Sequence, residues 1–294
     1  MNQSVASRIF DVFNIILMAL LAFICLYPMV YVLFSSVSNP SFLMMRSGLM
    51  LWPAGFTLEG YALVFRNPII LTAYRNTAIY LFAGTAIQIV MTSIAAYVLS
   101  RRTFFFRNAM AMIIVFTMYF SGGMIPFYLT VKETLGLYNN IWPMILPGAI
   151  STWNLIIMRT SFRNIPESLE ESAHLDGAGH LTVLFRIIIP LSLPVMAVMV
   201  LYYAVGHWNS WFNALLFLRD RSLFPLQLIL REILIANSTT EFMEVTQVDQ
   251  TMKDDYRLLV QYATIIVATV PILLSYPFLQ RYFIKGIMIG AIKG

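Results

Sequence analysis

Charged residues are scarce in this chain of 294 residues. Only 11% of the residues are Asp, Glu, Lys or Arg, whereas 59% are hydrophobic and the mean hydropathy is +0.76. In a typical soluble domain about a quarter of the residues are charged. The composition therefore excludes an ordinary soluble domain and predicts an integral membrane protein.

Charge is missing altogether from the six longest apolar runs. Carriers driven by protons or sodium ions commonly place ionisable side chains inside the membrane to bind the coupling ion. His207 is the only strongly titratable side chain in these runs, and a single histidine is more typical of a structural hydrogen bond. An ion-coupled carrier is disfavoured on this ground, although a sodium site built from backbone carbonyls stays open.

The chain also lacks a phosphate-binding loop. Such a loop has the pattern G-x-x-x-x-G-K-[ST], in which backbone N–H groups and the lysine hold the phosphates. None of the four lysines follows a glycine: Lys132, Lys253, Lys285 and Lys293. We therefore expect no cofactor and no ATPase activity in this chain, so any nucleotide chemistry must come from another polypeptide.

Cysteine occurs once, as Cys25 in the first apolar run. A single cysteine permits no intramolecular disulfide, and its surroundings show no metal-ligand spacing. We expect Cys25 to behave as a small apolar side chain that packs or faces lipid. The sequence predicts no metal site.

The apolar runs themselves are each about long enough to cross a bilayer, which requires about 20 residues in a helix. Backbone groups inside lipid must pair within their own segment, so these runs should be helices. The sequence predicts an all-α polytopic membrane protein, with residues 1–294 forming a single transmembrane domain. The predicted spans are 13–37, 76–100, 109–130, 141–158, 190–218 and 259–280.

Orientation follows from the short loops. Total Lys and Arg counts on the two sides are nearly equal, but the compact RRTFFFR turn carries three arginines and the VKETLGLYNN turn one lysine. Short loops weigh most in the positive-inside rule, so both termini should be cytoplasmic. The N-terminal apolar run exceeds a signal-peptide core, and we expect it to be retained. This places 38–75 and 219–258 outside.

Helix-breaking residues interrupt the third predicted span. Ser121-Gly122-Gly123 and Pro126 do not suit a helix interior, so a break or kink is expected here. The interruption could bend the helix for packing, or a broken helix could line a polar cavity. Outside the spans, 225–236 has apolar residues at helical spacing and predicts an amphipathic helix.

A polar, acidic segment lies between the fourth and fifth spans, within 159–189. Between Pro166 and His180 it carries four acidic residues and neither Lys nor Arg. Pro166 can open a helix whose glutamates complement its positive N-terminus, and Gly177-Ala178-Gly179 allows a sharp turn. The segment predicts a short acidic helix and a tight corner that can dock on a soluble partner, the alternative being an ordinary solvated loop.

The spacing within this segment resembles the cytoplasmic EAA loop of ABC-importer permeases. Glu171 is followed by a small pair, by Asp176-Gly177, by nine residues, and then by Ile187 and Pro190. The chain resembles the carbohydrate-uptake class, of the shorter maltose-permease type with six helices and the type I importer fold. It departs from the family pattern at Ser172, usually alanine, and at Ile189, commonly leucine.

The resemblance implies a site and a set of partners. It assigns docking on the ATPase to Glu171, Ala173, Asp176 and Gly177. It implies a second homologous permease, two ABC ATPase subunits and an extracytoplasmic solute-binding protein, with no role for nucleic acid. The expected location is the bacterial inner membrane, in contact with lipid.

The fifth span carries the predicted substrate path. Tyr202, Gly206, Asn209 and Asn213 recur at helical spacing and should share one face. Amides, a hydroxyl and little bulk suit a polar path, although helix–helix hydrogen bonds would use the same residues. Tyr119 and Ser121 beside the third-span break are secondary candidates.

The predicted function is thus a non-catalytic permease subunit of an ABC importer for oligosaccharides. The segment SGGMIPFYL resembles the branch linked to complex and acidic oligosaccharides such as alginate or pectin fragments. Arg75, Lys132 and His207 are candidates for contact with an anionic substrate, or for headgroup contacts. A self-contained secondary carrier or channel is the alternative, and a membrane enzyme is a third, more remote one.

Overall fold

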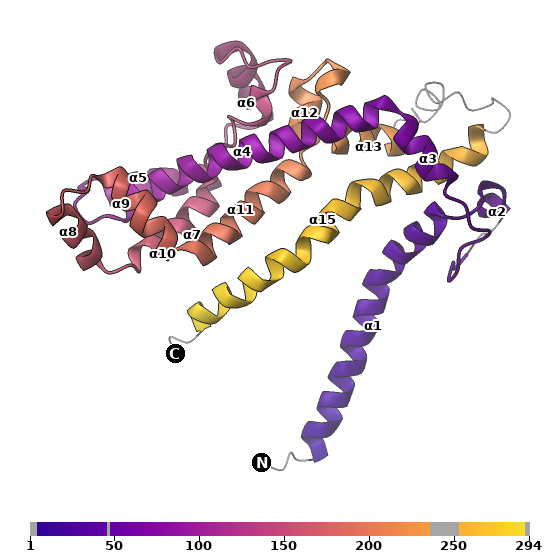
Figure 1. The fold of residues 1–294 in the computed structure, drawn as a ribbon, viewed down its shortest axis with the longest axis horizontal. Helices are drawn as coiled ribbons and strands as arrows, with labels where there is room; N and C mark the ends of the chain where they lie inside the picture. The colour runs from indigo at the N-terminus through magenta and orange to yellow at the C-terminus, as the bar shows by residue number, and fades with distance from the viewer. Residues whose placement is uncertain (1–4, 46–47, 236–252, 292–294) are drawn as a thin grey trace. The chain divides into compact units, whose positions relative to one another are not determined.

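The computed structural model describes residues 5–45, 48–235 and 253–291, and these residues are helical apart from loops and one isolated bridge between Ser38 and Phe56 (Figure 1). The first helices are α1 (Val5–Ser36), α2 (Pro40–Met45), α3 (Glu59–Arg66), α4 (Pro68–Ser100), α5 (Arg107–Tyr119), α6 (Met124–Leu129) and the π-helical η1 (Thr130–Thr134). They are followed by η2 (Trp142–Met144), α7 (Thr152–Arg163), α8 (Glu167–Leu175), α9 (His180–Val183), the π-helical η3 (Leu184–Ile188) and α10 (Ile189–Leu191). The last are α11 (Leu193–Trp208), α12 (Phe212–Phe217), η4 (Arg221–Leu223), α13 (Leu226–Ile235) and α15 (Lys253–Ala291).

The chain divides into two compact units. The first comprises Met1–Pro68 and Leu230–Val270, and the second Ile69–Ile229 and Pro271–Gly294. In the first unit, α3 lies against α15 so closely that a Cβ on Gly60 would lie 2.8 Å from Leu259 Cγ. Tyr256 Oη also donates to Glu59 Oε2 at 2.9 Å. The glycine therefore permits the helix contact that holds α3 in place.

Helix α1 exposes its apolar surface over most of its length, whereas its last two residues, Ser35 and Ser36, are buried. None of its most apolar stretch within Ser7–Ser36 is buried inside the chain. Cys25 lies on this helix and is exposed. Because large apolar side chains in water are costly, this surface requires lipid or another subunit to cover it.

Membrane-spanning helices are recognisable by length and apolar composition among the described residues. Three are continuous: Ser7–Ser36, Pro68–Ser100 and Tyr256–Leu274. Two more candidate spans are broken, with Arg107–Tyr119 and Met124–Thr134 meeting at 114° and His180–Leu191 and Leu193–Trp208 at 91°. The predicted interruption of the third span is confirmed, because α5 ends two residues before Ser121 and α6 begins after Gly123.

Two predicted spans are wrong in detail. The run 141–158 is not one helix, because after η2 the chain is irregular until α7 begins at Thr152. The run 190–218 is not one helix either, because the chain bends sharply at Ser192 and α11 ends at Trp208. Of the two runs, only 190–218 overlaps a candidate span of the described residues, and apolar composition did not reveal where the helices stop.

The predicted loops 38–75 and 219–258 also contain helices. Helix α4 begins at Pro68, inside the predicted loop 38–75, because proline suits the first position of a helix. Helix α13 confirms the amphipathic helix expected over 225–236. Residues 236–252 of the predicted loop 219–258 lie outside the described residues.

The second unit is organised around α4, whose inward face is polar. Asn76 Nδ2 donates to the carbonyls of Ser222 and Phe224, at 2.7 and 3.1 Å. Farther along, the Thr92 and Tyr203 hydroxyls are 2.6 Å apart. Hydrogen bonds of this kind hold helices together in an apolar environment, where burial alone provides little attraction between them. An apolar cluster joins α4, α7, η3 and α11 at Leu99, Met158, Phe162, Leu184 and Met199.

Candidate functional site

The acidic helix α8 ends in a well-formed turn at one end of the second unit (Figure 1). Gly177 has φ +83°, in the left-handed region that favours glycine. Its N–H donates to the His174 carbonyl at 3.0 Å, and the Ala178 N–H donates to the Ala173 carbonyl at 2.9 Å. These paired bonds form a Schellman motif, which satisfies the last carbonyls of the helix. The predicted tight corner at 177–179 is confirmed.

A buried ion pair attaches α8 to α4. Glu170 forms a salt bridge with Arg101, and their side chains are only 12% and 10% exposed. The Tyr97 hydroxyl donates to the second oxygen of the same carboxylate. Arg101 Nη2 also donates to the Phe162 carbonyl at 3.0 Å, which adds α7 to the network. A buried charge pair needs such additional hydrogen bonds to offset its loss of water.

A second arginine bonds α7 to α4 in the same region. Arg159 Nε donates to the Leu99 carbonyl at 2.9 Å. Burial lowers the pKa of the Arg159 guanidinium below its ordinary value, and repulsion from Arg163 and Arg107 adds to the effect. The group stays charged at neutral pH because the ordinary value is far higher. Arginines of the turn after α4 thus pair with the acidic helix, as Arg101 does with Glu170 and Arg102 with Glu167, while Arg159 joins α7 to α4.

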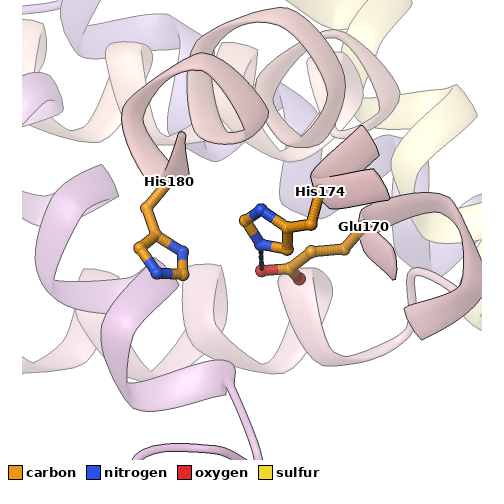
Figure 2. Close-up of side chains that lie close together, drawn as sticks. All are labelled: Glu170, His174 and His180. Atoms are coloured by element: carbon orange, nitrogen blue, oxygen red, sulfur yellow. Dashed lines mark ion pairs between the residues drawn. The ribbon is translucent and has the colours of Figure 1, made fainter. Parts of the chain in front are cut away.

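A polar hollow of about 320 Å³ opens beside this network. Its lining includes the two histidines that flank the turn, and Figure 2 shows both rings close to the Glu170 carboxylate. His174 Nε2 lies 3.6 Å from Glu170 Oε1, and its Nδ1 lies 2.8 Å from the Ala178 carbonyl. His180 Nδ1 lies 3.5 Å from the Tyr97 hydroxyl. The hollow therefore brings three potential ligands together across the corner.

A second, smaller cavity of about 160 Å³ lies between α4, α11 and α12. Its polar lining comprises Gln88, Tyr202, Tyr203, His207, Ser210 and Asn213, with Gly148 and Gly206 beside them. Gln88 bridges two elements, because its Nε2 donates to the Gly148 carbonyl at 2.8 Å and its Oε1 lies 3.0 Å from His207 Nε2. Gly84 makes room for this arrangement, since a Cβ there would lie 2.2 Å from His207 Nε2.

A cluster of cations and aromatic rings comprises Tyr128 on α6, Lys132 on η1, Tyr138 in the loop after η1 and Arg219 just after α12. Lys132 Nζ lies 5.1 Å from the centre of the Tyr138 ring and 5.4 Å from that of Tyr128. Arg219 approaches the Tyr138 ring at 6.0 Å. Such distances allow cation–π attraction. We refer to these four residues as the basic aromatic cluster.

The turn that carries Tyr138 is fixed to the end of α12. Asn139 has φ +51°, and its Oδ1 accepts from the backbone N–H groups of Arg219 and Asp220 at 2.9 Å each. Asparagine tolerates this backbone conformation better than most residues. Asp220 in turn accepts from Ser222, and these hydrogen bonds hold the pKa of the Asp220 carboxyl below its ordinary value. These hydrogen bonds therefore hold the loop with Tyr138 in place beside the end of α12.

Comparison with known proteins shows the family to which this chain belongs. The family described as the binding-protein-dependent transport system inner membrane component matches residues 69–289, about three quarters of the chain. This chain belongs to that family. Protein LplC of Bacillus subtilis (strain 168) is 40% identical over 294 residues, which cover 100% of the chain and 98% of LplC.

Two further similarities concern polysaccharide transport. The polygalacturonan/rhamnogalacturonan transport system permease protein YtcP of B. subtilis (strain 168) is 38% identical to this chain, covering 98% of it and 99% of YtcP. A chain in the crystal structure of a bacterial ABC transporter involved in the import of the acidic polysaccharide alginate matches with a TM-score of 0.87. The identity to that chain is 30%, with 96% of this chain and 99% of that one covered.

These relatives confirm that the chain is a permease of the carbohydrate-uptake class of ABC importers, with the all-α polytopic fold expected for it. The family description also makes it a multi-pass component of the inner membrane. A self-contained carrier or channel is therefore the weaker interpretation.

The four predicted coupling residues lie together on α8 and its turn. Glu171, Asp176 and Gly177 are exposed, and Ala173 is partly buried against the apolar cluster of the second unit. Leu175, between them, is 90% exposed. The corner therefore presents an apolar side chain and two carboxylates together on its exposed surface.

Glu170 is the residue of this corner that sequence reasoning missed. Of the four acidic residues between Pro166 and His180, Glu170 is the one that is buried and bonded to α4. The sequence pattern does not distinguish it from the other three. The signal was present in the sequence, since a glutamate at the start of α8 and the Arg101-Arg102 pair after the second span offer complementary charges. Only the structure shows which glutamate faces which arginine.

The predicted substrate path is partly assembled. Tyr202, Gly206 and Asn213 line the smaller cavity together. Asn209 does not, because the helix ends before it and its Nδ2 donates to the Val205 carbonyl at 3.0 Å. The single face expected from the spacing is therefore wrong. Tyr119 and Ser121 are exposed beside the break after α5 and do not line this cavity.

Sequence reasoning also missed the contribution of α4 to the cavity. Gln88 faces His207 from that helix, and the expectation of a structural histidine is confirmed by their hydrogen bond. The signal was a series of polar residues at helical spacing in an apolar run, notably Gln88 and Thr92, which mark one face of a helix.

Proposed function

We propose that this permease moves acidic oligosaccharides across the bacterial inner membrane, driven by ATP hydrolysis on ATPase subunits that dock at α8. It performs no catalysis itself, and ATP and Mg²⁺ are bound by those subunits. The observation that carries the substrate assignment is the basic aromatic cluster. The coupling assignment rests on the anchored acidic corner.

The coupling role follows from the combination of exposure and attachment. Glu171, Asp176 and Leu175 present charge and apolar surface to a partner. Beneath them, Glu170 joins α8 to Arg101 at the end of α4. Because two backbone hydrogen bonds close the turn at Gly177 and Glu170 joins α8 to Arg101, movement of a docked partner would be passed to α4 as displacement of a whole helix.

The substrate class follows from charge and ring surface. Lys132 and Arg219 supply two cations around the Tyr138 ring. Cations pair with uronate carboxylates, and aromatic rings can lie against the apolar faces of sugars. YtcP and the alginate transporter are named for acidic polysaccharides, which supports the same class here. The smaller cavity, with its amides and hydroxyls, offers hydrogen bonds to sugar hydroxyls farther along.

The remaining partners complete this proposal. A second homologous permease would form the pathway with this chain, and an extracytoplasmic solute-binding protein would deliver substrate. Both termini and α8 would then be cytoplasmic, with the basic aromatic cluster on the outer side. Supporting this, α8 is acidic and bonded to arginines that the positive-inside rule places in the cytoplasm.

The coupling proposal is tested by purifying the chain from its native membrane in mild detergent and identifying the retained proteins by mass spectrometry. An ABC ATPase and a second homologous permease are expected. Reversing the charge with Glu171→Lys should reduce the amount of ATPase retained. Recovery of the chain alone, with transport activity intact, would contradict the proposal.

The substrate proposal is tested by uptake into proteoliposomes that contain the assembled transporter. Lys132→Gln and Arg219→Gln should each slow the uptake of oligogalacturonate or oligoalginate by about tenfold, as expected for about 1.4 kcal/mol per lost carboxylate contact. Arg66→Gln, an exposed arginine outside the cluster, is the matched control and should have little effect. Equal loss for a neutral oligosaccharide of the same length would refute the assignment to acidic sugars.

A further inference from the structure

The two histidines of the coupling corner are held in an arrangement that ATPase docking does not require. His174 lies in the last turn of α8 and His180 opens α9, so they face each other across the Gly177 turn (Figure 2). Their ring centres are 4.9 Å apart at an angle of 76°. With Glu170 they place three ligand atoms within 4.8 Å of one another.

The tautomer of His174 follows from its hydrogen bond. A backbone carbonyl only accepts, so the Nδ1 that lies 2.8 Å from the Ala178 carbonyl carries the hydrogen. This leaves Nε2 directed toward the Glu170 carboxylate. Metal-binding histidines commonly donate their other ring N–H to a carbonyl or carboxylate in this way, which fixes the ring.

The spacing between His174 and Glu170 is that of two ligands on one ion. The Nε2 to Oε1 distance of 3.6 Å is too long for a hydrogen bond. Two ligands at zinc distances of about 2.0–2.1 Å in a tetrahedron lie roughly 3.4 Å apart. The exposed His180 ring would complete the set by moving roughly 1–1.5 Å, since ligand atoms now up to 4.8 Å apart must reach the same tetrahedral spacing.

We propose that Glu170, His174 and His180 form a binding site for a divalent transition-metal ion of the zinc class. Two imidazoles and a carboxylate are ligands that zinc takes readily, with a fourth position left open. Tyr97 donates to Oε1 of Glu170 and Arg101 to Oε2, and such hydrogen bonds orient a carboxylate that binds a metal ion. The bound ion joins α8 to α9 across the corner, and so restrains the element proposed to contact the ATPase.

The test measures zinc on the assembled, purified transporter, carrying an affinity tag without histidine. After equilibration with micromolar zinc and removal of free ion, elemental analysis should find one more equivalent in the unaltered protein than in His174→Asn or His180→Asn. The affinity of this site should fall by at least about tenfold in either variant, because even loss of an outer contact costs 10–100-fold. Glu167→Gln is the matched control, since it removes an exposed carboxylate from the same hollow but none of the three ligands, and it should keep the ion.

Hydrogen exchange supplies a second measurement. Zinc should slow amide exchange across 167–183 in the unaltered protein and leave it unchanged in His180→Asn. Equal zinc content in all four proteins would overturn the site. Amide exchange across 167–183 that zinc does not slow in the unaltered protein would overturn it as well. Neither result depends on sugar uptake, so failure here is distinct from failure of the proposed transport function.

Discussion

At the scale of single residues, two neighbouring glutamates on α8 have opposite environments. Glu170 is buried and paired with Arg101, whereas Glu171 is exposed. Glu170→Gln would leave the arginine buried without its counter-charge, and breaking such a pair costs about 3–5 kcal/mol. We expect a clear fall in the thermal midpoint of the purified transporter.

Glu167→Gln, at an exposed glutamate of the same helix, is the matched control for this prediction. An exposed substitution of this kind changes stability by no more than about 0.5 kcal/mol, so the thermal midpoint should stay unchanged. Similar midpoints for the two variants would show that the buried pair contributes little to stability. Replacing both partners, as Glu170→Leu with Arg101→Met, should recover part of the loss, because no unpaired charge then remains.

At the scale of elements, the turn after α8 depends on one backbone conformation. Gly177 has φ +83°, and a Cβ there would meet no atom within 4 Å. Strain in Gly177→Val would therefore come from the backbone alone and cost about 1–2 kcal/mol. We expect reduced thermal stability of the transporter and weaker retention of the ATPase during purification.

Gly179 offers a close comparison within the same turn. Its φ is −76°, and a Cβ would again meet nothing within 4 Å. Gly179→Ala should therefore leave both stability and ATPase retention unchanged. If the two substitutions had the same effect, the loss would reflect general disturbance of the corner and the left-handed conformation would not be its cause.

Individual elements show how far sequence reasoning reaches. The acidic helix, its corner and the break after α5 were predictable, because proline and glycine mark where helices begin and end. The irregular segment before Thr152 and the end of α11 were not, since the surrounding residues are apolar and carry no comparable signal. There, hydrogen bonds from distant residues decide the backbone, such as Gln88 to the Gly148 carbonyl.

The sites show the same division. Exposed coupling residues could be selected from their spacing alone, because a linear pattern carries them. Glu170, and the cavity shared by Gln88 and His207, depend on which helix faces meet. The sequence shows which residues share a face of a helix but not which other helix packs against that face. These contacts therefore could not be deduced.

At the scale of the whole molecule, the expected orientation can be measured with single cysteines. In a Cys25→Ser background, Leu175→Cys is on the acidic corner and Leu135→Cys follows η1; the native leucines are 90% and 56% exposed. A membrane-impermeant maleimide should label position 175 only in inside-out vesicles and position 135 only in right-side-out vesicles. The reverse pattern would invert the proposed direction of transport, and labelling of both positions from one side would rule out the predicted topology.

Helix α4 is long enough to transmit a displacement across the hydrocarbon layer. Its 33 residues extend about 50 Å, against a hydrocarbon layer of about 30 Å. Tyr80, twelve residues after the start of α4, donates to the Leu223 carbonyl, and Tyr97, near its end, donates to Glu170. These anchors are about 26 Å apart along the axis, close to the thickness of the layer. An axial displacement of the acidic corner is therefore transmitted to the loop at η4 through one continuous helix. No flexible joint within that helix would absorb part of the displacement.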